Sequence, residues 1–398
     1  MSTAAGASNT LPSSAPSCAA PDRLRFNLSE ASGSLGDLGT FLPIAAALAA
    51  VNRMDLGTIF LFAGAMNIAT GLLFRLPVPV QPMKAIAAIA IAESLTPGAI
   101  AASGMAMGVI VTTLALVGAV RWIDAVAPRA VVRGVQAGVG AKLALTGMAW
   151  TAGLPAVGVD SAAAAVVLAA LVALVAGRRL PVALLLFLLG LSLAAWRARD
   201  EFGSMPWSPP TLGPIAPTAQ DWITGLTRGV IPQLPLTLLN SVIAVCALSS
   251  DLFPGRGVAP RRMALSVGLM NLLCAPFGGM PMCHGAGGLA AQHRFGARTG
   301  GSVVMLGAGK IIFALALGGS LMTLAQGFPR AILAVLVFFA GLTLMKPARE
   351  SLRSAQPAVV MLLTAATIVL AGALVGVLVG SAAAGALARL KAERANAA

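Results

Sequence analysis

The chain consists of long apolar stretches that charged residues interrupt only at intervals. A helix needs about 20 apolar residues to cross a bilayer, and many stretches come near that length. Porin strands would alternate polar and apolar positions, and these stretches do not. The pattern therefore predicts an all-α polytopic membrane protein with about 14 transmembrane helices. The predicted spans are residues 35–51, 56–75, 78–93, 98–120, 130–149, 160–177, 180–196, 222–248, 262–275, 277–292, 301–325, 328–345, 357–371 and 373–390.

The composition agrees with this pattern and predicts how the chain is divided. Of its 398 residues, 58% are hydrophobic and 10% charged, against about 25% charged in a soluble domain, so a soluble enzyme is excluded. Residues 1–24 are rich in Ala, Ser and Pro and lack an apolar core, which predicts a disordered cytoplasmic tail rather than a signal peptide. We expect a first membrane repeat at 25–196 (spans 1–7), an extracytoplasmic loop at 197–221, a second repeat at 222–390 (spans 8–14) and a cytoplasmic tail at 391–398.

The net charge of +14 follows from how the basic residues are distributed between the two sides. If the N-terminus is cytoplasmic, nineteen of the 27 basic residues lie inside and five outside. The remaining three, Lys84, Lys142 and Lys310, lie within predicted spans. This bias is typical of a multi-pass protein and predicts a cell-membrane location with both termini cytoplasmic. No nucleic-acid partner is needed to explain the charge.

Two dipeptides of the first half recur in the second half. One lies in the second span of each half, and the other lies in the third span. Met66-Asn67 matches Met270-Asn271, and Pro82-Met83 matches Pro281-Met282. Seven spans per half would place the second half upside down in the membrane. Inverted repeats with interrupted helices at matching positions are typical of secondary transporters and indicate the binding site. Chance coincidence of Met, Asn and Pro in apolar sequence remains the alternative.

Four segments resemble the molybdate transporter family, a branch of the sulfate permease superfamily. They are GDLGTFLP (36–43), PVQPMKAIAA (79–88), PQLPLTLLNSVIAVCALSSDLFP (232–254) and GMPMCHGAGGLAAQHRFGARTG (279–300). The resemblance implies a 7+7 inverted repeat, in which a core of spans 1–4 and 8–11 packs against a gate of spans 5–7 and 12–14. It also implies molybdate as the substrate, a homodimer, and no C-terminal regulatory domain.

The third predicted span has the sequence of a broken helix. Pro77 and Pro79 prevent a continuous helix, and Pro82 suits the first turn of a new one, because its missing N–H costs nothing there. We expect that helix to run from Pro82 to Ile91 and to begin near the bilayer midplane. Its free N–H groups and its dipole would then point at an anion.

The tenth predicted span repeats this arrangement. Gly278, Gly279 and Pro281 break the chain, and residues 283–288 begin a helix. Two facing helix ends contribute about +0.5 charge each, and Lys84 adds one more if it faces the site. The sum, about +2, matches a dianion such as molybdate. The candidate substrate ligands are Gly39, Thr40, Gln81, Pro82, Met83, Lys84, Ala85, Gln233, Asn240, Cys283, His284 and Gly285.

These residues also have purely structural interpretations. Gly and Pro often only pack or kink membrane helices, and Gln or Asn side chains can be interhelical hydrogen-bond partners. Lys84 could extend to the membrane interface, although a lysine several residues inside an apolar stretch is usually functional. The four cysteines form no C-x-x-C pair, so we expect no metal, disulfide framework or cofactor.

Importing a dianion requires an energy source. Moving two negative charges into a cell at −100 mV costs about 4.6 kcal/mol, and the sequence contains no GxxxxGK[ST] motif for ATP. We therefore expect proton coupling, with Asp37 and His284 as candidate carriers; a helix cap is the alternative role of Asp37. Related transporters often carry a coupling carboxylate in the eighth span, where this chain has Gln233 and Asn240.

The functional prediction is thus a secondary active transporter that imports a tetrahedral oxyanion by alternating access. The choice of molybdate rests on the resemblance alone, since helix-end chemistry would serve sulfate equally well. The alternatives are a sulfate or other anion transporter or exchanger, or a passive anion channel on the same scaffold. A membrane-embedded enzyme using Cys283 and His284 is a remote alternative, because the two are sequence neighbours rather than a spaced pair.

Overall fold

The computed structural model describes residues 23–119, 128–175, 182–202, 207, 209–318 and 320–397. The predicted tail up to residue 22 lies outside the described residues. The first half contains α1 (Leu28–Ser34), η1 (Leu35–Asp37), α2 (Leu38–Asn52), α3 (Leu56–Phe74), β1 (Val80–Pro82), α4 (Lys84–Glu93), α5 (Pro97–Leu116), α7 (Arg129–Ala152), α8 (Ala162–Val175), α9 (Val182–Arg197) and α10 (Arg199–Phe202).

The second half also has a short strand followed by a short helix. It contains α11 (Ala219–Thr224), η2 (Gly225–Val230), α12 (Ile231–Leu236), η3 (Thr237–Ile243), α13 (Ala244–Leu252), α14 (Pro260–Cys274), η4 (Ala275–Phe277), β2 (Met282–His284), α15 (Ala286–Arg294), α16 (Gly301–Leu317), α17 (Ser320–Gln326), α18 (Arg330–Met345), η5 (Lys346–Arg353), α19 (Ala355–Ala371) and α20 (Ala373–Ala397). The two halves meet in the antiparallel pair formed by β1 and β2.

Five helices in the described residues are long and apolar enough to cross a membrane on their own. They are Leu56–Phe74, Pro97–Leu116, Ala219–Leu252, Arg330–Arg353 and Ala373–Lys391. α8, α9, α16 and α19 are shorter apolar helices, and the segments Leu28–Asp37 and Thr40–Asn52 form a pair bent by 48°. Each predicted span overlaps at least one of the helices observed.

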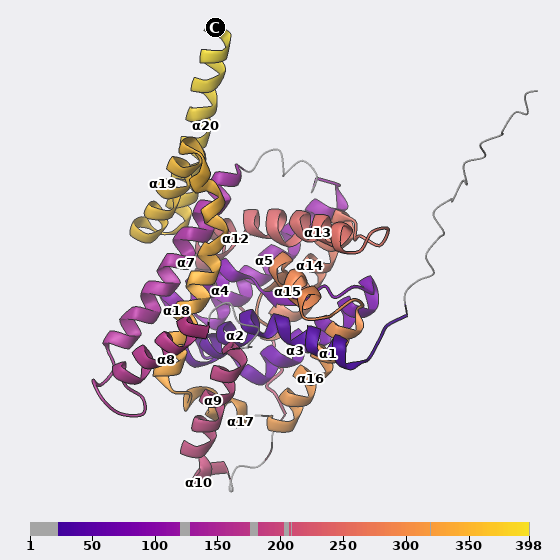
Figure 1. Cartoon of the computed structure of the whole chain (residues 1–398), viewed down its shortest axis with the longest axis vertical. Coiled ribbons are helices and arrows are strands. Elements are labelled where there is room, and N and C mark those ends of the chain that lie inside the picture. The colour runs from indigo at the N-terminus through magenta and orange to yellow at the C-terminus, as the bar shows by residue number, and fades with distance from the viewer. Residues whose placement is uncertain are drawn as a thin grey trace, which may run out of the picture.

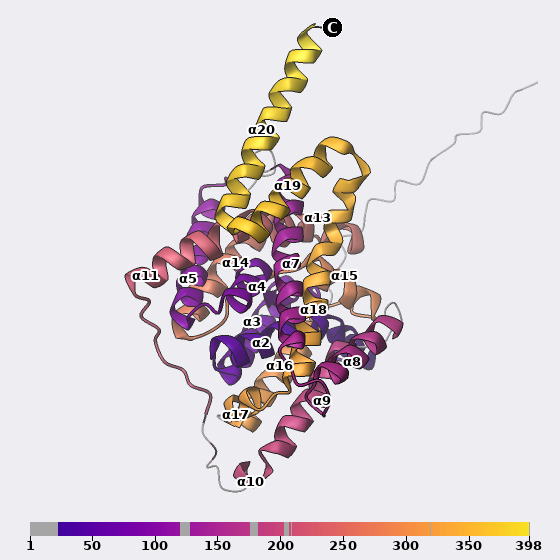
Figure 2. The same ribbon diagram turned by 90° about the vertical axis from the view of Figure 1, so that its left-hand side faces the viewer.

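The most extensive helix packing is consistent with a 7+7 repeat. α3 packs along α16, and α5 packs along α14 (Figures 1 and 2). If α3 corresponds to α14 and α5 to α16, exchanging the two halves turns one pair into the other. α7 packs along α18, its own counterpart, and also along α19. Small residues allow these close approaches: a Cβ on Gly64 would lie 2.7 Å from the Gly307 carbonyl oxygen.

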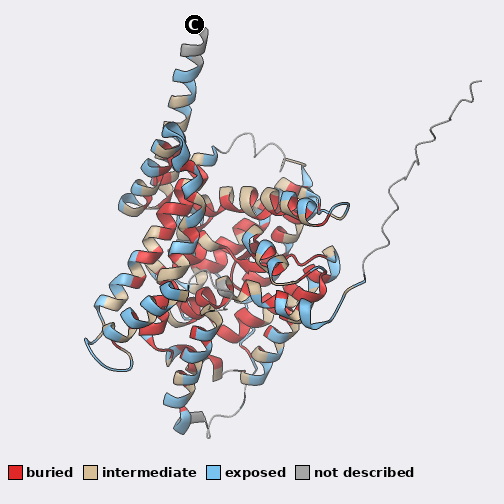
Figure 3. Ribbon diagram, viewed as in Figure 1, coloured by how far each residue is buried: buried red, intermediate tan, exposed pale blue. Residues whose placement is uncertain are grey.

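Burial is concentrated in the middle of the molecule, around α4 and the two strands (Figure 3). The seven residues from Ala85 to Ile91 are all buried. By contrast, α20 extends away from the rest and ends at the C-terminus (Figures 1 and 2). Only 17% of its apolar window is buried by protein. An exposed apolar surface of this kind suits contact with lipid.

The long helix Ala219–Leu252 is irregular. Two stretches, Gly225–Val230 and Thr237–Ile243, are π-helical and flank the prolines of α12. Pro232 and Pro235 remove backbone donors, and wider π turns are one way for a helix to accommodate this. The irregularity widens the helix where it passes the start of α4, which it contacts.

Candidate functional site

The centre of the candidate site is the two-stranded ribbon that joins the broken spans. Val80 pairs with His284, Gln81 with Cys283 and Pro82 with Met282. The ribbon continues one step further, because the Met83 amide donates to the Pro281 carbonyl at 2.8 Å. Because the strands are antiparallel, α4 and α15 leave the ribbon at opposite ends. Both helix starts therefore flank it.

The expected helix starts are wrong by two or three residues. α4 begins at Lys84 rather than Pro82, and α15 at Ala286 rather than Cys283. The residues assigned to the first helical turns instead form the ribbon, whose pairing satisfies backbone groups that would otherwise be unpaired in the membrane. Pro82, which has no N–H, suits a strand of a two-stranded ribbon equally well.

Two matching asparagines hold the ribbon in place. Asn67 Oδ1 accepts from the amide of Val80, the first residue of β1, at 2.9 Å. Asn271 Oδ1 accepts from the amide of Met282, the first residue of β2, at 2.8 Å, and its Nδ2 donates to the Met282 carbonyl. These are the asparagines of the sequence repeat. The equal roles give that repeat a physical meaning.

A small cavity of about 20 Å³ lies beside the ribbon. Its volume is close to what one water molecule requires. The lining comes from two groups of helices. α4, α12, η3 and β2 belong to the expected core, and α7 and α18 belong to the expected gate. The lining residues are Lys84, Gln136, Gln233, Leu236, Asn240, Ser241, Cys283, His284 and Leu344.

Five of the predicted ligands meet at this cavity: Lys84, Gln233, Asn240, Cys283 and His284. The other predicted ligands do not line it. Gly39 and Thr40 lie in α2, Gln81 and Pro82 in β1, Met83 directly after β1, Ala85 in the first turn of α4, and Gly285 before α15. Substrate contact stays a prediction for all of them.

The amides at the start of α4 were expected to be free, but the side chain of Gln233 accepts hydrogen bonds from them. Its Oε1 accepts from the Ala85 amide at 2.8 Å and lies 3.4 Å from the Ile86 amide. Its Nε2 donates to Thr237 Oγ1, which fixes the orientation of the side-chain amide. A neutral oxygen from the eighth span therefore occupies the place that an anion oxygen would take.

Lys84 lies at the first position of α4, where the helix dipole disfavours a cation by a few tenths of a kcal/mol to about 1 kcal/mol. Its side chain lines the cavity and is only half-buried. No carboxylate in the described part of the chain forms an ion pair with it. An unpaired cation at a positive helix end suits an anionic ligand.

The two candidate proton carriers have different surroundings. His284 is buried and has both ring nitrogens 3.0 Å from neutral partners, the Pro79 carbonyl and Ser266 Oγ. Asp37 is fully buried, and its Oδ1 accepts from Gln81 Nε2. Asp37 precedes α2 without capping it, so the helix-cap alternative is wrong.

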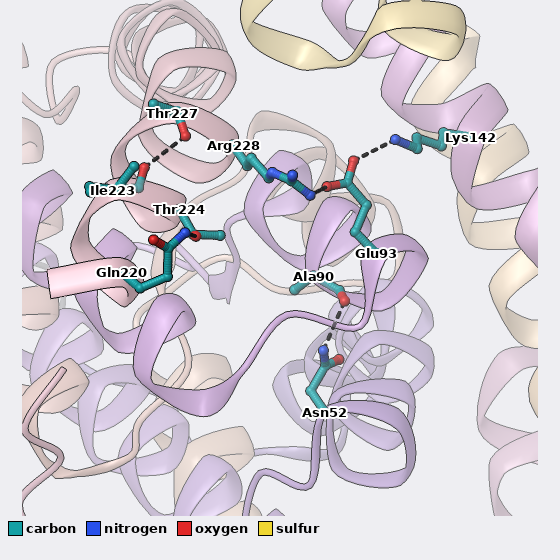
Figure 4. Close-up of polar contacts among 9 residues, drawn as sticks. All are labelled: Asn52, Ala90, Glu93, Lys142, Gln220, Ile223, Thr224, Thr227 and Arg228. Atoms are coloured by element: carbon teal, nitrogen blue, oxygen red, sulfur yellow. Dashed lines mark hydrogen bonds and ion pairs between the residues drawn. The ribbon is translucent and has the colours of Figure 1, made fainter. Parts of the chain in front are cut away.

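Glu93, at the C-terminal end of α4, connects both groups of helices (Figure 4). One carboxylate oxygen contacts Lys142 Nζ on α7, and the other lies 2.6 Å from Arg228 on η2. The Glu93 side chain is 15% exposed, whereas the Arg228 side chain is 57% exposed. This ion-pair triad fastens α4 to α7 at the end of the half-helix opposite the ribbon.

A larger cavity of about 200 Å³ lies elsewhere, under the proline-rich segment 209–218 that precedes α11. Arg53, Asp55 and Phe277 line it together with residues of that segment. The segment is held there by hydrogen bonds from Thr58 Oγ1 to the Thr211 carbonyl and from the Ile215 amide to the Pro276 carbonyl. Arg53 and Asp55 bring opposite charges to this cavity, so it lacks a net positive charge for an anion.

A profile described as "Molybdate transporter of MFS superfamily" matches residues 29–143 and 225–344, more than half of the chain. The chain belongs to this molybdate transporter family. It is 40% identical over 383 residues to Molybdate transporter 2 of Arabidopsis thaliana, covering 85% of this chain and 82% of that protein. It is 32% identical to Molybdate transporter 1 of Chlamydomonas reinhardtii, covering 85% and 87%. The predicted family is confirmed, and with it a transporter rather than an enzyme.

Solved structures show the fold. The transmembrane domain of the cyanobacterial bicarbonate transporter BicA aligns with a TM-score of 0.64 at 17% identity, covering 91% of this chain and 98% of that chain. The murine Solute Carrier 26 family member A9 anion transporter aligns with a TM-score of 0.70 at 14% identity, covering 93% and 69%. The predicted fold class, a multi-pass helical membrane protein with broken third and tenth spans, is confirmed.

Four lining residues were not predicted from the sequence: Gln136 of α7, Leu236 of α12, Ser241 of η3 and Leu344 of α18. Gln136 is a buried polar residue inside an apolar span, and that signal could have identified it. Leu236, Ser241 and Leu344 carry no comparable signal. Lys310, the third lysine within a span, is buried close to Asp37 and is considered below.

Proposed function

We propose that this chain is a secondary active transporter that imports molybdate by alternating access. The names of its relatives in Arabidopsis and Chlamydomonas support the substrate. The observation that carries the proposal is the meeting of Lys84, the start of α4 and the ribbon at one cavity between two groups of helices. Sulfate or another tetrahedral oxyanion is the alternative substrate.

The charge at this cavity suits a dianion. Two helix starts contribute about +0.5 each, and Lys84 contributes +1, which gives about +2. Gln233 holds the α4 amides in the conformation described. We infer that the anion displaces the Gln233 oxygen or shares these amides with it, so the substrate competes with a neutral hydrogen-bond acceptor.

The position of the cavity supports alternating access. An oxyanion needs far more room than about 20 Å³, so α4 and the ribbon must move relative to α7 and α18 to admit it. The Glu93 triad joins the same two groups of helices. We propose that it holds them together in the conformation described, and that substrate entry or exit accompanies its opening.

Proton coupling is the proposed energy source. A dianion moved alone against −100 mV costs about 4.6 kcal/mol, and each accompanying proton lowers that cost by about 2.3 kcal/mol. Asp37 is a fully buried carboxylate one hydrogen bond from the ribbon, which suits a carrier. We further propose that the protein resides in the cell membrane as a homodimer with both termini cytoplasmic.

Uptake into proteoliposomes tests the proposal. We expect labelled molybdate to accumulate above its external concentration when the outside is more acidic, and excess sulfate to compete weakly. Lys84→Ala should abolish accumulation, whereas Lys391→Ala, at an exposed position on α20, should leave it unchanged. Accumulation unaffected by Lys84→Ala would remove Lys84 from the site. Equilibration without accumulation would indicate a channel, and uptake that requires an internal anion would indicate an exchanger.

A further inference from the structure

Lys310 is a buried cation in the middle of α16. Its relative exposure is 3%, and its Nζ lies 3.6 Å from the centroid of the Phe41 ring. Phe41 packs in turn against Phe60, and Phe60 against Phe313 of α16. Within the described residues, Nζ has no hydrogen-bond acceptor. A membrane-embedded lysine whose three donors are unused is costly and is usually functional.

Asp37 lies four residues before Phe41, the residue whose ring contacts Lys310 Nζ, and it is the acid whose charge acts on Lys310. It ends η1, at the 48° bend between the segments Leu28–Asp37 and Thr40–Asn52. Oδ1 accepts from Gln81 Nε2, and Oδ2 has no partner among the described residues. The two side chains do not form a closed ion pair, so each keeps an unpaired polar group in a buried setting.

Few other charges face this pair. On neighbouring α1, Glu30 Oε1 accepts from the Arg298 and Thr299 amides. α2, α3 and α17, which surround the pair or pack against α16, carry no charged residue. Lys84, at the cavity, is the second cation whose charge acts on Asp37.

His293 lies at the far end of α15 rather than beside the pair. Partial burial and the Arg298 guanidinium lower the pKa of His293. Its ring packs at 5.5 Å against the ring of Phe253. What distinguishes Asp37 from Glu30 is its hydrogen bond to Gln81 of the ribbon, which connects its carboxylate to the proposed anion site.

Gln81 connects the pair to the proposed anion site. It lies in β1 opposite Cys283, which lines the cavity. Its side-chain amide faces the start of α15, where a Cβ on Gly285 would lie 1.9 Å from Gln81 Oε1 and one on Gly288 2.4 Å from Nε2. Asp37 is thus one hydrogen bond from the ribbon that holds both helix starts.

We propose that Asp37 carries the coupled proton and that Lys310 is the positioning residue that sets when Asp37 takes it up. This rests on the proposed function. With a dianion at the ribbon, Asp37 Oδ2 accepts one proton from the water on the side of entry, and Lys310 remains an ammonium. When the anion leaves, the same proton passes to the water on the side of exit.

The charges explain the sequence of events. The carboxylate and the ammonium sum to zero, and the protonated pair has a charge of +1. A nearby dianion favours the positive form, so anion binding and proton binding assist each other. Asp37 is hydrogen-bonded to Gln81 of the ribbon, and Lys310 contacts Phe41 of the helix that follows Asp37, so the pair would move with the ribbon and its anion.

The test compares molybdate exchange with proton-driven uptake in proteoliposomes. Asp37→Asn should keep exchange of internal for external molybdate but lose proton-driven accumulation and molybdate-induced proton entry. Asp251→Asn, at an exposed carboxylate on α13, should keep all three. Unchanged proton entry in Asp37→Asn would overturn the proposal. If the wild-type protein transports no oxyanion at all, the proposed function itself fails.

Lys310 is tested by the pH profile, which a merely structural role would not move. Lys310→Met removes a cation beside Asp37, so the carboxylate should protonate more easily and the pH limit of driven uptake should rise by about one to three units. Lys310→Arg keeps the charge and should restore the wild-type profile. If Asp37→Asn fails to fold, judged by gel filtration, this pair of variants decides. An unshifted profile in a folded Lys310→Met protein overturns the proposal.

Discussion

Gln233→Glu is the substitution that tests most sharply whether an anion binds at the start of α4. It replaces one NH₂ group by an oxygen and leaves the shape of the side chain unchanged. The new carboxylate can still accept from the Ala85 and Ile86 amides, where Gln233 Oε1 does so now. It would place a negative charge where the substrate must come.

The magnitude follows from two competing costs. A unit charge about 5 Å from a dianion, at an effective dielectric constant of about 20, is repelled by about 6.6 kcal/mol. Protonating the introduced carboxyl at pH 7, from a reference pKa of about 4.3, costs about 3.7 kcal/mol. Because protonation is the less costly of the two, the introduced carboxyl should be protonated when molybdate binds. Gln233→Glu should therefore bind molybdate about 500-fold more weakly at pH 7 and regain about tenfold per pH unit on acidification.

Equilibrium binding of labelled molybdate to the purified protein at pH 6, 7 and 8 measures this. Gln233→Met is the matched control, because it removes the hydrogen bonds without adding charge. Each neutral hydrogen bond is worth about 0.5–1.5 kcal/mol, so its effect should be small and independent of pH. Wild-type affinity in Gln233→Glu at pH 7, or an equal loss at all three pH values, would refute binding at this helix start.

Two further predictions concern the ribbon and the triad. Glu93→Gln removes the shared partner of Lys142 and Arg228. We expect this to weaken the association of α4 with α7 by about 1–2 kcal/mol, because only 15% of the Glu93 side chain is exposed. Spin labels on α5 and α7 should then show a larger population with the helices apart, and an unchanged distance distribution would contradict this. Gly285→Ala places a Cβ 1.9 Å from Gln81 Oε1 and should abolish molybdate binding, whereas Gly287→Ala, with open space around it, should not. Equal binding by the two variants would show that Gln81 is not packed there.

The sequence predicted where the two helices break but not how the breaks are filled. Pro and Gly are local signals, and they identified both interrupted spans. The pairing of Val80 with His284 joins residues 204 positions apart, and no local preference encodes it. For this reason the helix starts were placed too early.

Side-chain partners from distant spans explain the other differences. Gln233 was a candidate ligand because it is polar in an apolar span, but its contact with the Ala85 amide depends on how two helices pack. Lys310 was recognised only as a lysine within a span, since its closeness to Asp37 arises when α16 packs beside α1 and α3. The matching asparagines were found as a repeat, and their role in holding β1 and β2 required the fold.

The most direct measurement is the structure of the protein with bound tungstate, whose tungsten atom is located by its scattering. The account predicts one tungsten site beside the ribbon, about 5 Å from the Lys84 ammonium and from the first amides of α4, the span of one hydrogen bond and one metal–oxygen bond. The Gln233 oxygen should have moved away from the Ala85 amide or share it with the anion. A tungsten site in the larger cavity lined by Arg53, with the ribbon region unoccupied, would contradict the account.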